Sequence, residues 1–66
     1  MNKYQEIVKA AAKIFKAKGY HAATVQDIAN EVGMLKGSLY YHIHGKEQLL
    51  MEVLSSAVEV VRSGLA

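Results

Sequence analysis

Apolar residues recur every three or four positions along most of this chain, which is the repeat of an α-helix rather than of a β-strand. Lysines fall largely on the other faces of the first such segment, and Gly19 follows it in a position that suits a left-handed helix cap. We therefore expect an amphipathic helix over residues 3–18. Its apolar face comprises Tyr4, Ile7, Val8, Ala11, Ile14 and Phe15.

A second, shorter helix is predicted by its start signal. Thr24 is a residue type that caps helix N-termini, and Asp27 stands three residues later in an acidic form of the capping box. Gly33 interrupts the apolar repeat that follows. These features predict a helix over residues 24–31.

Two more helices follow. Leu39 and Ile43 are four residues apart, which predicts a third helix over residues 36–43 with both side chains facing the core. Gly45 ends that helix, and a fourth is expected from Lys46 to about residue 62. The broad apolar stripe of the fourth helix comprises Leu49, Leu50, Val53, Leu54, Ala57, Val58 and Val61.

The chain length allows one small domain. The sequence has 66 residues, of which 52% are hydrophobic, and this excludes intrinsic disorder. There is no Cys, so neither a disulfide nor a thiolate zinc site is possible. No apolar run approaches the roughly 18 residues of a membrane span. The N-terminus lacks the apolar core of a signal peptide, so a cytoplasmic location is the default expectation.

The expected fold class is all-α. Two short helices joined by a Gly-containing turn are typical of a helix-turn-helix, so we expect a three-helix, homeodomain-like bundle with a longer fourth helix. Residues 1–46 would form the helix-turn-helix domain, and residues 47–66 the fourth helix.

Positive charge gathers in two segments. Residues 1–20 hold five lysines against one glutamate, and residues 34–46 hold Lys36 and Lys46. The net charge of +2 is only a weak indication of a nucleic-acid partner.

The polar residues of the predicted helix-turn-helix fit DNA contacts, because the second helix of such a pair enters the major groove. Lys36 is suited to a guanine edge or a phosphate, and Tyr41 to thymine methyl groups. Gln26 is placed to reach a base. Phosphate contacts are expected from helix starts and hydroxyl groups, at Thr24, Ser38, Tyr40 and Lys46.

A family resemblance covers nearly the whole chain. Four runs resemble the N-terminal DNA-binding region of TetR/AcrR-type transcriptional regulators, namely Thr24 to Ala29, Gly33 to Met34, Lys36 to Ile43 and Lys46 to Leu49. The string Gly-Ser-Leu-Tyr-Tyr-His, followed closely by Lys-Glu-Gln-Leu, is a specific part of this likeness.

The resemblance implies a homodimeric repressor that binds a palindromic operator in duplex DNA and releases it on binding a small-molecule effector. It implies that the effector pocket and the main dimer interface lie in a domain after the fourth helix, which this sequence does not contain. Family phosphate contacts carry over to Thr24, Ser38, Tyr40, His42 and Lys46, and base contacts to Gln26, Lys36, Gly37 and Tyr41.

One position departs from the family pattern. Leu35 stands where the family often has a Ser or Thr cap before the recognition helix. The departure puts capping of that helix in doubt and frees Leu35 for an apolar surface of DNA or protein.

Several residues also fit roles other than DNA contact. Of the two adjacent tyrosines, we expect one ring inside the core and Tyr41 outside. His42 and His44 are two residues apart, so they do not share a helix face, and we expect no metal or other cofactor. No nucleophile has a base and an orienting acid nearby, so an enzyme is not expected.

An alternative function is a small protein-interaction module that docks through the apolar stripe of the fourth helix. In that case Leu54, Val58 and Val61 would dominate binding. A membrane-surface role for residues 3–18 is a weaker interpretation, because their apolar face is needed for the core.

Overall fold

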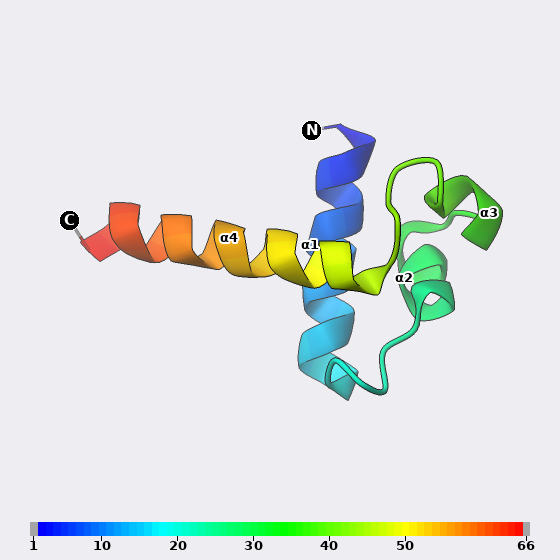
Figure 1. Cartoon of the computed structure of the whole chain (residues 1–66), viewed down its shortest axis with the longest axis horizontal. Coiled ribbons are helices and arrows are strands. Elements are labelled where there is room, and N and C mark those ends of the chain that lie inside the picture. The colour runs from blue at the N-terminus through cyan, green and yellow to red at the C-terminus, as the bar shows by residue number, and fades with distance from the viewer. Residues whose placement is uncertain (1, 66) are drawn as a thin grey trace.

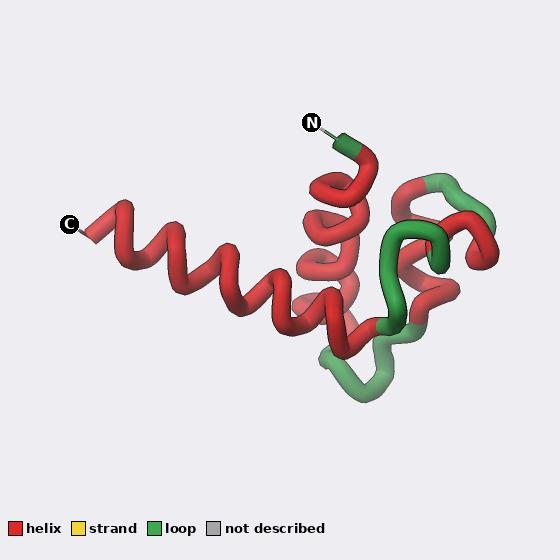
Figure 2. The backbone as a smooth tube through the Cα atoms, turned by 45° about the horizontal axis from the view of Figure 1, so that its top comes forward, coloured by secondary structure: helices red, strands yellow, loops and turns green. Residues whose placement is uncertain are grey.

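The computed structural model describes the backbone of residues 2–65 and the side chains of residues 2–55. This part of the chain consists of helices and loops, with no strand (Figure 2). The helices are α1 (Lys3–Lys18), α2 (Val25–Val32), α3 (Lys36–Leu39) and α4 (Lys46–Leu65). The expected all-α fold with a longer fourth helix is confirmed.

The first three helices form a body that α4 crosses and then leaves. The helix α1 packs against both α2 and α4, and α3 rests on α2. The far end of α4 lies at the opposite end of the molecule from α3 (Figure 1).

The core contains one large, fully buried side chain from each helix: Ile7, Ile28, Leu39 and Leu49. Small alanines of α1 and α2 fill the space between them, which lets the helices approach closely. Among the described side chains, no polar or charged residue is buried. The core is therefore purely apolar, and each helix contributes directly to it.

The capping signals predicted where α1 ends and where α2 begins and ends. Gly19 ends α1 with a positive φ of 85° but a ψ of 153°, so it does not adopt the left-handed helical conformation that the sequence predicts. Thr24 Oγ1 accepts a hydrogen bond from the Asp27 amide, and the Asp27 carboxylate accepts one from the Thr24 amide, both at 3.0 Å. Gly33 closes α2 in the left-handed conformation at φ 71°. The helix itself covers residues 25–32, one position later than expected.

The prediction for the third helix was wrong at its C-terminal end. Its four residues are followed by a turn rather than by helix to Ile43. In this turn the amides of Tyr41 and His42 donate to carbonyls three residues back, at 3.1 and 2.9 Å, which tightens the backbone. The uncapped start at Leu35 and the glycine at position 37 both weaken a longer helix. Ile43 still reaches the core and is buried.

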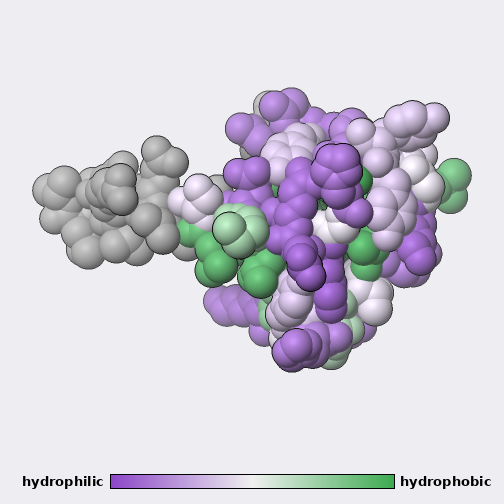
Figure 3. Space-filling view, in the orientation of Figure 1, coloured by the Kyte–Doolittle hydropathy of each residue, from purple (hydrophilic) through white to green (hydrophobic). Residues whose placement is uncertain are grey.

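The fourth helix runs beyond its predicted end near residue 62. Leu49 and Val53 pack on the core as expected, while Met51 and Leu54 are 68% and 51% exposed. Hydrophobic surface gathers near the place where α4 leaves the body (Figure 3). The part of the predicted stripe from Ala57 onwards lies outside the described side chains. No helix in the described part of the chain is long and apolar enough to cross a membrane.

Polar contacts fix the position of α4 on α1. The Tyr4 hydroxyl donates to Glu52 Oε2 at 2.6 Å and accepts from Gln48 Nε2 at 3.3 Å. The hydrogen bond to the Glu52 carboxylate raises the pKa of Tyr4 above its ordinary value. Gln48 also accepts from the His44 amide at 2.7 Å, so one side chain holds α1, α4 and the turn before α4 together.

Candidate nucleic-acid interface

The predicted DNA-contacting residues lie on two adjoining segments, the start of α2 and α3 with its following turn. These segments adjoin because α2 packs against α3. Ser38 and Lys46 are half-buried, and the other predicted contacts are exposed, namely Thr24, Gln26, Lys36, Gly37, Tyr40, Tyr41 and His42. The buried partners of the same segments, Leu39 and Ile43, point the other way into the core.

The start of α2 is organised to receive an anion. Thr24 Oγ1 accepts a bond from the Asp27 amide, so its hydroxyl hydrogen can be donated outward. The first-turn amides of Val25 and Gln26 have no carbonyl partner within their own helix. Together these groups match the hydrogen-bonding needs of a phosphate oxygen.

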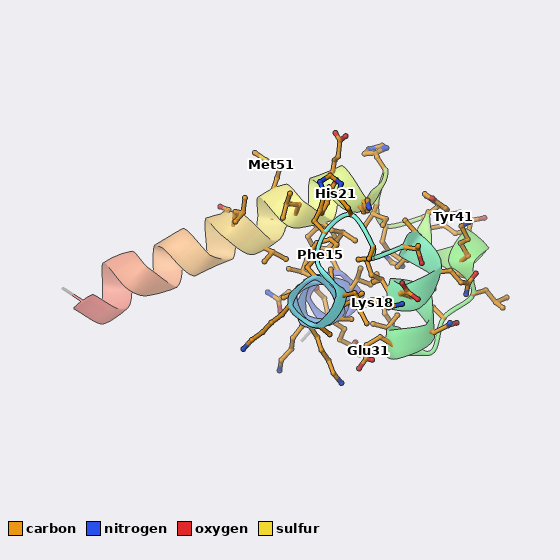
Figure 4. The ribbon with its side chains drawn as sticks, turned by 90° about the horizontal axis from the view of Figure 1, so that it is seen from below. Phe15, Lys18, His21, Glu31, Tyr41 and Met51 are labelled. Carbon is orange, nitrogen blue, oxygen red and sulfur yellow. The ribbon has the colours of Figure 1, made fainter. Side chains whose placement is uncertain are left out.

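Two ion pairs between helices neutralise the acidic residues of α2. Lys18 Nζ lies 3.0 Å from Asp27 Oδ2, and Lys13 Nζ lies 2.8 Å from Glu31 Oε2. Lys18 and Glu31 both lie along the α1–α2 side in Figure 4. The Lys18 hydrogen bond, followed by those from Thr24, holds the pKa of Asp27 below its ordinary value. As a result, Asp27 and Glu31 repel an anionic ligand much less than two unpaired carboxylates would.

Gln26 projects from the exposed face of α2, where its Nε2 donates to Asn30 Oδ1 at 2.9 Å. This bond joins neighbouring side chains on one helix face and orients the Gln26 amide. The amide retains one donor and one acceptor for a base edge.

The backbone at Gly37 is open to the outside. A Cβ placed there would meet nothing within 4 Å, and its φ is not positive. Neither packing nor backbone conformation in the described chain therefore requires glycine at this position. Its missing side chain leaves the backbone of α3 accessible to close approach by another molecule.

The expectation of one buried tyrosine ring was wrong. Tyr40 is 46% exposed and Tyr41 is 90% exposed, so both rings reach solvent, with Tyr41 the more exposed as predicted. The helix ends at Leu39, and the turn then directs both tyrosines outward while Leu39 and Ile43 fill the core. Figure 4 shows Tyr41 at the outer side of this segment.

Lys46 occupies a different environment from the one expected. Its ammonium donates to the carbonyl oxygens of Tyr20 and Ala23 at 2.7 and 2.9 Å and to that of His21 at 3.4 Å. It also lies 4.4 Å from the centroid of the Tyr20 ring, which packs edge-on against Phe15 at 5.3 Å. An ammonium has three donors, so a phosphate contact by Lys46 would have to replace one of these bonds.

Sequence reasoning missed these contacts, because neither the Lys46 carbonyl cluster nor the ion pairs of α2 follow a helical repeat. His42 and His44 are both exposed. Within residues whose placement is described, no three His, Asp or Glu side chains gather in a way that would hold a metal ion.

Comparison with known proteins agrees with this arrangement. Residues 7–53, which include parts of α1 and α4 and all of α2 and α3, match the model of the family described as bacterial regulatory proteins, tetR family. The chain belongs to the TetR family. The HTH-type transcriptional repressor KstR2 of Mycolicibacterium smegmatis is 49% identical over 49 residues, which are 74% of this chain and 24% of that protein.

Two further proteins extend the likeness. The HTH-type transcriptional regulator LmrA of Bacillus subtilis is 40% identical over 63 residues, covering 94% of this chain and 34% of LmrA. A crystal structure of apo AibR superposes with a TM-score of 0.79 at 33% identity, covering 92% of this chain and 34% of that one. The chain therefore spans about a quarter to a third of the length of these relatives.

Proposed function

We propose that this chain binds duplex DNA and regulates transcription as the DNA-binding part of a TetR-type repressor. The observation that carries the proposal is the division of the segment 36–43, in which Leu39 and Ile43 are buried while Lys36, Tyr41 and His42 are exposed. A recognition helix in the major groove needs apolar side chains that hold it on the core and exposed polar and aromatic side chains that face the DNA, and this segment has both.

The residues divide into two roles. Gln26, Lys36, Gly37 and Tyr41 contact base edges, and Lys36 is suited to the two acceptors of guanine. Phosphates are held by Thr24, Ser38, Tyr40 and His42, which fix the register of α3 without reading sequence. Lys46 lies close to the phosphate-facing start of α2 and supports it through the carbonyls of the preceding loop.

Further parts of the proposal rest on the family. A homodimer would bind two half-sites of a palindromic operator in the cytoplasm, about one helical turn or more apart. A small-molecule effector would act through a domain outside this sequence. Without that domain, we expect the chain to bind DNA weakly and with strong salt dependence.

The test is an amide chemical-shift titration of the labelled chain with a mixed-sequence duplex, at about 50 and about 200 mM salt. We expect salt-sensitive shifts concentrated in residues 24–27 and 36–46. The variant Lys36→Ala should weaken them, and Lys16→Ala, which removes an exposed lysine of α1, serves as the matched control. Unchanged spectra at both salt concentrations would overturn the proposal.

The alternative of a protein-interaction module is favoured by one observation, the exposure of Met51 and Leu54 on α4. It predicts concentration-dependent shifts in residues 50–65 and none near α3. The same titration, extended to a dilution series without DNA, separates the two functions.

A further inference from the structure

Leu35 is exposed to an unusual degree for a large aliphatic side chain. It is 78% exposed, more than Met51 or Leu54. Leu35 directly precedes α3. The far end of α4 lies at the opposite end of the molecule from α3, so α4 does not cover this region (Figure 1).

The position of Leu35 is also unfavourable for the helix it precedes. Leu35 is the N-cap of α3, with φ −73° and ψ 146°, and its side chain makes no capping hydrogen bond. Thr24 holds the equivalent position in α2, where its side chain and its amide both form capping hydrogen bonds. Leucine is among the weakest N-cap residues, and α3 is a single turn that would gain most from a good cap. When a residue disfavours the local structure and no contact within the protein compensates for this, a functional role is expected at that position.

The surroundings of Leu35 limit what it can contact. It directly precedes Lys36 and the open backbone of Gly37, at the N-terminal end of the helix proposed to enter the major groove. Residues at this end of a recognition helix contact base edges. Among the groups that base edges display in the major groove, the thymine C5-methyl is the apolar one.

We propose that Leu35 is a specificity-determining residue that selects thymine by packing its isobutyl group against the C5-methyl. The inference deepens the proposed function and rests on it. Thymine and uracil differ only in this methyl group, so a thymine-to-uracil substitution in the DNA removes the contact without changing any hydrogen bond.

The experiment begins with selection of duplexes from a random-sequence library by the 66-residue chain at low salt. Each thymine of the enriched duplex is then replaced by uracil, and affinity is measured for the native chain, Leu35→Ala and Leu35→Ser. We expect a position, separate from any that Tyr41 contacts, where uracil lowers native affinity about fourfold, the value of one buried methyl-sized group. Both variants should lose this discrimination. Leu54→Ser, which alters an exposed leucine on α4, should retain it.

A second measurement separates recognition from folding. Leu35→Ser supplies a side-chain oxygen that can cap α3, so its unfolding temperature should rise above that of Leu35→Ala. Loss of thymine discrimination in the more stable variant cannot then come from misfolding. Tyr41→Ala should keep the Leu35-dependent uracil effect, since Tyr41 is expected to contact other methyl groups.

The outcomes are distinguishable. An enriched sequence whose uracil substitutions affect native and Leu35→Ser chains equally would remove the role of Leu35 and leave DNA binding intact. Failure to enrich any sequence, together with unchanged spectra in the DNA titration, would overturn the proposed function and this inference with it.

Discussion

The ammonium of Lys46 lies 2.7 Å from the carbonyl oxygen of Tyr20 and 4.4 Å from the centre of the same residue's ring. Tyr20 belongs to the loop that leads to Thr24, and Lys46 is the first residue of α4. The pair therefore connects the start of the long helix to the loop that precedes the proposed phosphate site. Because the donor is charged and the carbonyls are partly buried, these bonds stabilise more than an ordinary surface contact.

Replacing Lys46 by Met should lower the free energy of unfolding by about 1–3 kcal/mol, since it removes a charged donor shared by several carbonyls. Urea unfolding measures this loss, with Lys16→Met as the control for an exposed lysine. DNA binding gives a second reading. If Lys46 acts through the loop, the dependence of affinity on salt keeps its slope, whereas a lost phosphate contact reduces that slope by about 1.

Lys36→Ala should cost about 1–3 kcal/mol of binding free energy on a selected duplex and relax the base preference at one position. Lys36 is exposed beside Gly37 and is suited to guanine, so the loss should be larger on selected than on random DNA. Fluorescence anisotropy with both duplexes measures the difference. Equal losses on the two would contradict base reading by Lys36.

Gly37→Ala should have opposite effects on folding and binding. An added Cβ meets nothing in the described chain, so the helix should gain about 0.5–1 kcal/mol of stability. The same methyl group would keep DNA from approaching the backbone, so affinity should fall. Gly33→Ala is the contrasting variant, because its φ of +71° makes alanine strained and the protein less stable. A Gly37→Ala chain with unchanged affinity would argue against close approach at this residue.

Low pH should lower the stability of the folded chain, in part through protonation of Asp27. Its pKa is lowered from 3.8 by Lys18 and by the Thr24 hydrogen bonds, so the charged form favours the folded state. This contribution is present above pH 3.8 and is lost as the pH falls through the lower folded-state value. Asp27→Asn should therefore be less stable than the native chain at neutral pH, with the difference shrinking in acid. Unfolding temperatures measured as a function of pH test this, with Glu47→Gln as the control.

The helices and most of the core could be predicted from sequence because both follow local rules. Thr24 and Asp27 are three residues apart and cap one helix, and Leu39 and Ile43 both reach the core at the predicted spacing. The end of the third helix could not be read in this way. The helical spacing of Leu39 and Ile43 is also compatible with one helical turn followed by a tighter turn, and only the backbone bonds distinguish the two.

The contacts that shape the candidate site are between residues distant in sequence. Lys46 bonds to carbonyls 23 to 26 residues earlier, and Lys13 pairs with a glutamate 18 residues later. Every residue has a backbone carbonyl oxygen, so the sequence does not show which carbonyls a lysine contacts. Isolated charged residues form no periodic pattern that would reveal their partners. Sequence patterns therefore indicated which residues face outward at the start of α2 and at Tyr41. They assigned Lys46 a phosphate contact and did not show that its ammonium is bonded to backbone carbonyls.

The shortness of α3 has a consequence for engineering. A single helical turn does not persist alone in water. The conformational entropy lost in nucleating a helix exceeds the free energy gained from the hydrogen bonds of one turn. The conformation of residues 36–43 depends on Leu39 and Ile43 being seated on the other helices. A synthetic peptide of this segment should therefore fail to bind DNA. To transfer the DNA-sequence preference of this segment to another protein, its outward-facing residues must be placed on a scaffold whose core already has sites equivalent to those of Leu39 and Ile43.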